Sequence, residues 1–225
     1  MEGLEFRNAG ADDVKVVVGL LLNAAIVGSA HIATLEEDVA KREDFLRALV
    51  AAGDTEYGYE QVTLAELGGR AVGLFLGFPR DTLAAIGPRT LSLIMRGRSP
   101  LSWPGLISRQ SKIARAEPPP PPASYLLRAL CLEPGASDEI VKTMLGEAVA
   151  EAETEECTSV AVNVFEPEME RALPLLTAGG FMEHARRPVA DKKISRVLGN
   201  ESVQMIRPTA YVAPPDDSDD YDEAG

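Results

Sequence analysis

Apolar residues follow a strand-like pattern in the middle of the chain. Gln61–Glu66 and Ala71–Phe78 are rich in β-forming residues and flank the dipeptide Gly68-Gly69. Glycine adopts the positive φ angles that a tight hairpin turn needs. The two runs therefore predict an antiparallel hairpin.

The N-terminal part predicts one strand and two helices. Leu4–Phe6 is a short apolar run typical of a strand. Asp12 predicts the N-cap of a first helix with one apolar face, formed by Val14, Val17, Val18, Leu21 and Leu22. Thr34 and Glu37 have the spacing of a capping box and predict the start of a second helix. The segment between the helices, Gly28–Ile32, is predicted to be a loop.

The second half of the chain predicts a strand–helix–strand unit. Ser124–Leu132 and Thr158–Val164 read as buried strands, and Ser137 suits the N-cap of the helix between them. That helix has an apolar face made of Ile140, Val141, Met144, Leu145, Ala148 and Ala152. A helical crossover of this kind joins parallel strands.

A further helix and two strands complete the pattern. Pro167 fits the first turn of a helix that Gly179-Gly180 ends, and Pro174 predicts a kink within it. Phe181–Arg187 and Ser202–Arg207 then read as strands. The predicted fold is α/β, with about seven strands in one mixed sheet flanked by helices.

Residues 81–117 interrupt this order with a basic, broken-helical excursion, and 118–122 are five consecutive prolines that predict a stiff, non-helical connector. Such an amphipathic stretch is typical of a cover whose apolar side packs on its own domain. The alternative is a surface for anionic membranes or nucleic acid.

Charge narrows the classes of partner. The formal net charge of -13 argues against general nucleic-acid binding, which relies on clustered Lys and Arg. Six of the carboxylates lie in the last ten residues, after Pro214 and Pro215, so 212–225 are predicted to be a disordered acidic tail and 1–211 one domain.

Two further features bear on location and redox state. No run of 18 uncharged apolar residues is present, and Glu2 and Glu5 stand where a signal peptide would be basic, which predicts a cytoplasmic protein without a membrane span. Cys131 and Cys157 lack metal-ligand spacing and are predicted to be buried free thiols.

Several segments resemble the GNAT superfamily of acetyl-CoA-dependent N-acetyltransferases. Tyr125–Pro134 resembles the family's fourth strand, which commonly ends in an acidic residue and a proline. The stretch from Val160 through Gly180-Phe181-Met182-Glu183 is similar to its fifth strand, fourth helix and Gly-Phe turn. Phe6–Ala9 with Asp12-Asp13 resembles its opening strand and helix start, and Gly69–Gly73 its hairpin. The resemblance spans about residues 4 to 208.

The resemblance implies a cofactor and a reaction. Acetyl-CoA would pack between the splayed fourth and fifth strands, with its pyrophosphate on the loop before Ile140, and acetyl would pass to a primary amine of a small molecule or protein. The implied cofactor contacts are Cys131, Leu132, Gly135, Ala136, Ser137, Ile140, Val141 and Lys142. By position, Glu133 is the candidate base for the amine and Tyr125 a candidate acid. The resemblance is also compatible with a homodimer.

The sequence departs from the family at two functional positions. The pyrophosphate loop lacks the usual Arg and second Gly, while Asp138 and Glu139 occupy the first helical turn and repel a diphosphate. Leu176 stands where many members have the tyrosine that protonates coenzyme A, and Glu168 or Met169 stands where they often have an asparagine. Two functions stay open: a divergent N-acetyltransferase, or a non-catalytic binding or regulatory module.

Other candidate groups have both a chemical and a structural interpretation. Tyr57 and Tyr59 could replace the missing acid, yet strand tyrosines mostly serve packing. His31 lies in the segment that borders the family's acceptor site, and His184 lies on a predicted strand; each is also explained as a structural residue. Cys131 could act as a nucleophile, but no histidine lies near it in sequence.

Overall fold

The computed structural model describes residues 3–36, 38–96 and 98–211. The predicted acidic tail, 212–225, lies outside these residues. Among the described residues, no helix is both long enough and apolar enough to cross a membrane.

One mixed sheet runs through the molecule, with the strand order β1-β3-β4-β5-β6-β8-β7. Only β5 and β6 pair in parallel within this order. An additional short strand, β2, pairs with β5 away from this path. The strands are β1 (Leu4–Asn8), β2 (Ala25–Val27), β3 (Val62–Leu67), β4 (Arg70–Pro79), β5 (Ser124–Leu132), β6 (Ser159–Phe165), β7 (Met182–Pro188) and β8 (Glu201–Pro208). The predicted seven-stranded mixed sheet is confirmed, with β2 as an eighth strand.

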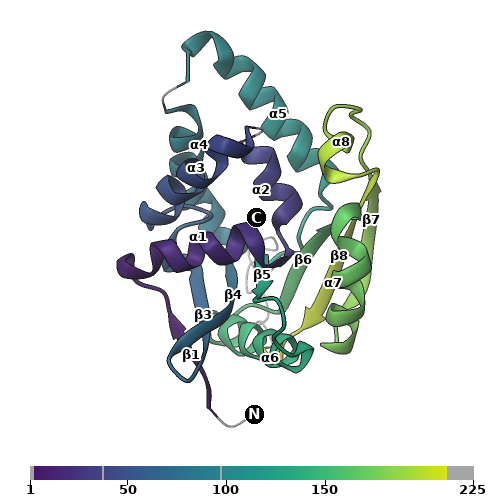
Figure 1. Cartoon of the computed structure of the whole chain (residues 1–225). Coiled ribbons are helices and arrows are strands. Elements are labelled where there is room, and N and C mark those ends of the chain that lie inside the picture. Colours follow the sequence, from purple (N-terminus) through teal and green to yellow (C-terminus); the bar gives the residue numbers. More distant parts are fainter. Residues whose placement is uncertain (1–2, 37, 97, 212–225) are drawn as a thin grey trace, which may run out of the picture.

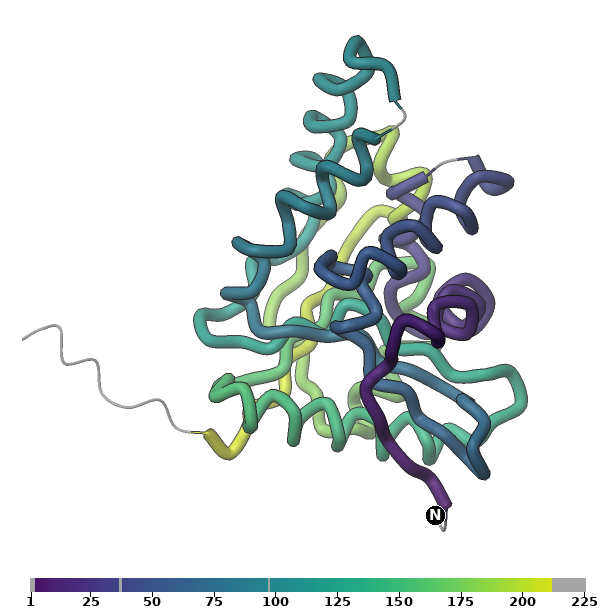
Figure 2. Tube along the Cα trace, turned by 90° about the vertical axis from the view of Figure 1, so that its left-hand side faces the viewer, coloured from purple at the N-terminus to yellow at the C-terminus, as the bar shows by residue number. Residues whose placement is uncertain are grey.

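Helices cover both faces of the sheet (Figure 1, Figure 2). One face packs on α6 and α7, and the other packs on α1, α3 and α4. A third, smaller cluster joins α2 and α5 to the segment around α8. The helices are α1 (Val14–Asn23), α2 (Ser29–Leu35), α3 (Val39–Ala51), α4 (Leu83–Met95), α5 (Trp103–Ala116), α6 (Asp138–Thr154), α7 (Glu166–Ala178) and α8 (Ser195–Leu198).

Local chemistry explains the elements that were predicted correctly. Gly68 and Gly69 have φ angles of +59° and +75° and form the turn between β3 and β4. The Ser137 hydroxyl caps α6 by accepting a hydrogen bond from the Glu139 amide at 3.3 Å. Both cysteines are free and buried, as predicted.

Two predictions for the segment that joins the first two predicted helices were wrong. Gly28–Ile32 is not a loop, because α2 begins at Ser29. Thr34 does not cap a helix: it lies inside α2, where its hydroxyl donates to the His31 carbonyl. The carboxylate of Asp38 caps α3 instead, accepting from the Ala40 amide at 3.0 Å. Glu37, the other half of the predicted capping box, lies outside the described residues.

Asp12 does not cap α1 either. Ala11–Asp13 form a short 3-10 turn before the helix, and Asp13 is the carboxylate that accepts a hydrogen bond there, from the Gly10 amide at 2.8 Å. Arg7 also holds Asp13, with its Nη1 2.7 Å from Oδ2. Asp13 stands at the N-cap position of α1, but its side chain makes no cap hydrogen bond to the helix.

The basic excursion forms the helical pair α4 and α5, which rises from the domain (Figure 1). Ile86, Ile94 and Ile113 are buried, so the predicted packing of its apolar side on its own domain is confirmed for these residues. The start of α5 and the turn before it differ, because Ile107 and Leu101 are 50% and 94% exposed.

Candidate functional site

Strands β5 and β6 separate part of the way along their length. Their pairing runs from Ser124 opposite Ser159 to Leu127 opposite Val162, whereas β5 continues to Leu132. The pairing of β5 with β4 shifts register at the same point. This separation is the place where the GNAT resemblance puts acetyl-CoA.

The edge of β5 beyond the separation is occupied by β2. Ala25 pairs with Cys131 and Val27 with Leu130 in antiparallel register. The Leu132 amide donates to the Ala24 carbonyl at 2.9 Å, which takes up the next donor on the same edge.

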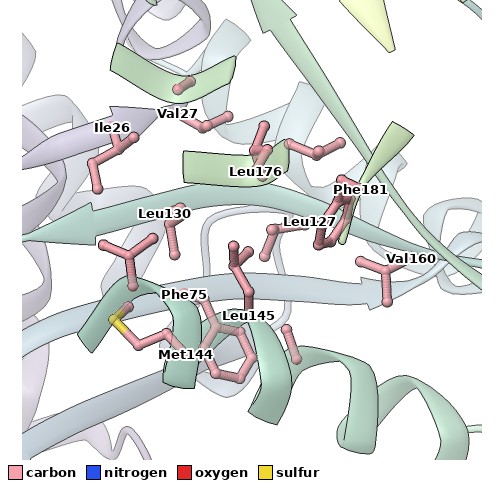
Figure 3. Packing of buried hydrophobic residues seen from close by; sticks show 14 of the residues in the cluster. Ile26, Val27, Phe75, Leu127, Leu130, Met144, Leu145, Val160, Leu176 and Phe181 are labelled. Carbon is pink, nitrogen blue, oxygen red and sulfur yellow. The ribbon is translucent and has the colours of Figure 1, made fainter. Parts of the chain in front are cut away.

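The β2 strand belongs to the core and is not a surface attachment. The side chains of Ile26 and Val27 are 2% and 1% exposed, and both lie in the cluster that contains Leu130 and Leu176 (Figure 3). Burying an aliphatic side chain of this size contributes about 1.5–3 kcal/mol. The segment is therefore held by apolar packing as well as by backbone hydrogen bonds.

Gly28 and Glu168 fix the C-terminal end of β2 against the rest of the fold. Gly28 has a φ angle of +102°, and a Cβ at this position would lie 2.8 Å from the Arg128 carbonyl oxygen. Glu168, at the start of α7, accepts from the Ser29 hydroxyl at 2.8 Å and from the Ala30 amide at 2.9 Å. Burial raises the pKa of Glu168, and these donors oppose that shift. Glu168 thus holds the chain's own segment at one of the two positions where the family often has a cofactor-binding asparagine.

The predicted pyrophosphate loop also satisfies its own groups. Ser137 and the first-turn acids Asp138 and Glu139 lie at the N-terminus of α6, where an anion would have to bind. The Lys142 ammonium lies 2.7 Å from Glu139 Oε1 and so neutralises an internal charge. Gly135 alone keeps the open backbone expected of such a loop, with a φ angle of +89°.

Of the other predicted cofactor contacts, Cys131, Leu132, Ile140 and Val141 are almost fully buried in the core, and Ala136 is partly buried against it. Burial raises the pKa of the Cys131 thiol, which does not favour a nucleophilic thiolate. With the edge of β5 paired and the anion position filled, the residues present do not fit acetyl-CoA in the place that the resemblance implies.

The two predicted catalytic residues lie at opposite ends of β5. Glu133, just past the strand, forms an ion pair with the exposed Arg70, at 2.9 Å from Nη2 to Oε2. The Tyr125 hydroxyl donates to Glu151 Oε1 at 2.8 Å, and burial raises the pKa of Tyr125. The structure does not bring Glu133 and Tyr125 together at one reacting centre.

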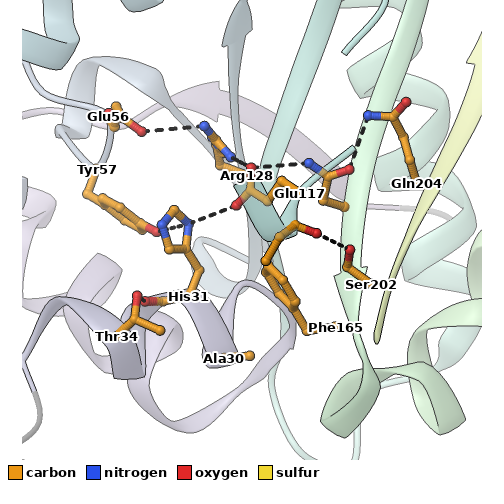
Figure 4. A network of polar contacts seen from close by, with 12 residues as sticks. Ala30, His31, Thr34, Glu56, Tyr57, Glu117, Arg128, Phe165, Ser202 and Gln204 are labelled. Carbon is orange, nitrogen blue, oxygen red and sulfur yellow. Dashed lines mark hydrogen bonds and ion pairs between the residues drawn. The ribbon is translucent and has the colours of Figure 1, made fainter. Parts of the chain in front are cut away.

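A polar network with little solvent exposure lies on the opposite face of the sheet from α6 and was missed in the sequence: the side chains of Arg128, Glu117 and Glu56 are 17%, 13% and 19% exposed. Arg128 Nη1 lies 2.9 Å from Glu117 Oε2, and its Nη2 lies 3.6 Å from Glu56 Oε2 (Figure 4). The Asn163 side chain also donates to Glu117 Oε2, at 3.2 Å. Burial is the largest single influence and would raise the pKa of Glu117, but the charges of Arg128 and His31, together with the hydrogen bonds from Arg128 and Asn163, lower the pKa overall. The signal was present: Arg128 is the one charged residue in the run Tyr125–Leu132, and a buried charge requires a partner.

His31 and Tyr57 border this network. The Tyr57 hydroxyl lies 3.1 Å from His31 Nδ1, and the same nitrogen lies 4.0 Å from Glu117 Oε1. Burial lowers the pKa of His31 and raises that of Tyr57. His31 therefore lies on α2 in a largely enclosed, polar environment, with 13% of its side chain exposed, whereas His184 is exposed on β7. No group of three or more His, Cys, Asp or Glu residues in the described part of the chain could hold a metal ion.

Comparison with known proteins places the fold. No protein-family model matches the chain, and a search of curated proteins finds no match. Among solved structures, an acetyltransferase is similar at 18% identity and TM-score 0.59, covering 91% of this chain and 99% of that one. An N-acetyltransferase from Staphylococcus aureus is similar at 12% identity and TM-score 0.57, covering 90% and 100%. A Salmonella typhimurium protein solved with its cofactor acetyl-CoA is similar at 14% identity and TM-score 0.53, covering 96% and 99%. The chain therefore has the GNAT fold that the sequence motifs predicted.

Proposed function

We propose that this chain is a GNAT-fold binding module in which strand β2 takes the place that acetyl-CoA has in the family. The observation that carries this proposal is the pairing of Ala25–Val27 with the edge of β5. The resemblance puts the cofactor between β5 and β6 where they separate, so β2 and the cofactor compete for this edge of β5.

Acetyl-CoA could bind at this edge only by offsetting the energetic cost of withdrawing β2. Withdrawing β2 would break its backbone hydrogen bonds and re-expose Ile26 and Val27, at a cost of about 1.5–3 kcal/mol for each side chain. It would also take away the Ser29 hydroxyl and the Ala30 amide, from which the buried Glu168 carboxylate accepts hydrogen bonds. Acetyl-CoA would then meet the carboxylates of Asp138 and Glu139 at the helix N-terminus.

The second candidate is an acetyl-CoA-dependent N-acetyltransferase that acts on a primary amine of a small molecule or protein. The similarity to solved acetyltransferases over about nine-tenths of the chain favours it. This function requires β2 to leave the edge of β5, or the cofactor to bind elsewhere.

Calorimetric titration with acetyl-CoA and with desulfo-coenzyme A separates the two functions. We expect no saturable binding to the wild-type chain or to the double variant Asp138→Asn/Glu139→Gln, because β2 blocks both. Micromolar binding to the wild type would overturn the proposal. Binding to the double variant alone would also contradict it, because the loop charges, and not β2, would then close the site.

A further inference from the structure

A second candidate site lies where α5 faces the segment around α8 (Figure 1). A cavity of about 310 Å³ opens between them. Its wall on α5 is formed by Ser108, Arg109 and Lys112, and the opposite wall is formed by Asp191, Lys193, Ile194 and Val197. A volume of this order suits a small molecule.

The charge of the cavity is opposite to that of the whole protein. The chain has a formal net charge of -13, yet residues 82–116 contain six Lys or Arg and no Asp or Glu. Three cations, contributed by both walls, and one carboxylate line the cavity. A concave surface lined with one sign of charge concentrates ligands of the other sign.

The one carboxylate is already committed to the protein. Asp191 Oδ2 lies 2.8 Å from Lys112 Nζ, and its Oδ1 accepts from the amides of Lys193 and Ile194 at 2.9 and 3.1 Å. The hydrogen bond from Lys112 is the main reason that the pKa of Asp191 is lowered to about 2. Asp191 thus orients the Lys193 turn and neutralises Lys112 in part, and within the described residues Lys193 has no ion-pair partner.

The remainder of the lining suits an organic ligand and not a bare ion. Ile194 is buried and Val197 is half-buried, so they form an apolar floor beneath the cations. Ser108 adds a hydroxyl that can donate to an anion.

We propose that this cleft binds a small organic anion, with its phosphate or carboxylate between Lys193 and Lys112 and its apolar body on Ile194 and Val197. The bound anion shares Lys112 with Asp191. The cleft shares no residue with β2, β5 or the loop before α6, and Thr34 of α2 also lines it.

Calorimetric titration of the full chain with phenyl phosphate and phenylacetate tests the cleft, with benzyl alcohol and inorganic phosphate as matched probes. The variant Lys193→Gln removes the cavity ammonium that has no ion-pair partner among the described residues. Lys192→Gln removes a neighbouring exposed ammonium that does not line the cavity. Both variants should keep the wild-type melting temperature, because neither lysine is buried.

We expect saturable binding of at least one aromatic anion, weaker binding of inorganic phosphate and none of benzyl alcohol. Lys193→Gln should weaken binding about tenfold, and Lys192→Gln less than about twofold, since hydrogen bonds to charged groups contribute most when they are direct. An absence of binding by either aromatic anion would overturn the proposal. Equal weakening by the two variants would overturn it as well, because that result indicates a general charge effect. Tighter binding of phenyl phosphate than of phenylacetate would identify a phosphate, and not a carboxylate, as the anionic group that the cleft prefers.

Discussion

The amide nitrogen of Leu132 donates a hydrogen bond to the carbonyl oxygen of Ala24 across 2.9 Å, joining the end of β5 to a segment more than a hundred residues earlier. This bond belongs to the edge of β5 that faces away from β4, because the neighbouring Glu133 amide bonds to Val72 of β4 instead. Closure of the cofactor site by β2 depends on the stability of this contact.

Gly28 allows β2 to lie this close to β5, so replacing it should loosen the segment. Gly28→Ala places a methyl group 2.8 Å from the Arg128 carbonyl oxygen in a backbone conformation that alanine disfavours. We expect a loss of about 2–4 kcal/mol in the free energy of unfolding, measured by denaturant titration. Gly19→Ala is the control: this helical glycine has open space around its Cβ position, and the variant should be neutral or more stable by up to about 1 kcal/mol. An equal effect of both substitutions would contradict the close approach.

Glu168 anchors the other end of the same segment. Glu168→Ala leaves the Ala30 amide and the Ser29 hydroxyl without their acceptor in a buried site, and should cost about 2–4 kcal/mol in unfolding free energy. Glu170→Ala, an exposed acid on the same helix, should change stability by less than about 0.5 kcal/mol. If Glu168→Ala were as mild as this control, the carboxylate would not be holding β2.

Arg128 and Glu117 should be strongly coupled, because each compensates a charge in the interior. Arg128→Met should destabilise the protein by about 3–5 kcal/mol, because it leaves the Glu117 carboxylate without its ion-pair partner. The double variant Arg128→Met/Glu117→Gln should recover part of that loss. Additive losses in the double-mutant cycle would show that the two charges do not depend on each other.

Acid should destabilise the fold through His31. Burial lowers the pKa of His31 below its ordinary value of 6.5, so below that pH the unfolded chain binds a proton that the folded chain does not. The contribution of neutral His31 to the free energy of unfolding is therefore fully present above about pH 6.5. It is lost as the pH falls towards the pKa of His31 in the folded protein, by up to about 1.4 kcal/mol per pH unit. His31→Gln should flatten the difference in unfolding free energy between pH 7.5 and 5.5. An unchanged slope in this variant would exclude His31 as the group responsible.

The sequence predicts well the elements whose local signals agree with their surroundings. The Gly68-Gly69 turn and the Ser137 cap each satisfy local backbone requirements, and both are present in the structure. The segments that carry the GNAT resemblance likewise report local turns and strand ends, and they lie on β4, β5 and β6 of the observed fold.

The closed site was not predictable because it depends on contacts between distant segments. Ala25–Val27 is only three residues long, and its identity as a strand comes from β5 and not from its own pattern. Thr34 carried a valid capping signal, but the competing Asp38 cap and the start of α2 at Ser29 prevailed. Glu117 was assigned to the edge of the basic excursion, yet Arg128 draws it into the interior.

Hydrogen–deuterium exchange at the Leu132 amide, measured with and without acetyl-CoA, shows whether β2 stays paired with β5. We expect strong protection of this amide and of Ala25–Val27 in the free protein, with no change at millimolar acetyl-CoA. Rapid exchange of Leu132 in the free protein, or release of Ala25–Val27 when acetyl-CoA is added, would contradict the claim that β2 closes the cofactor site.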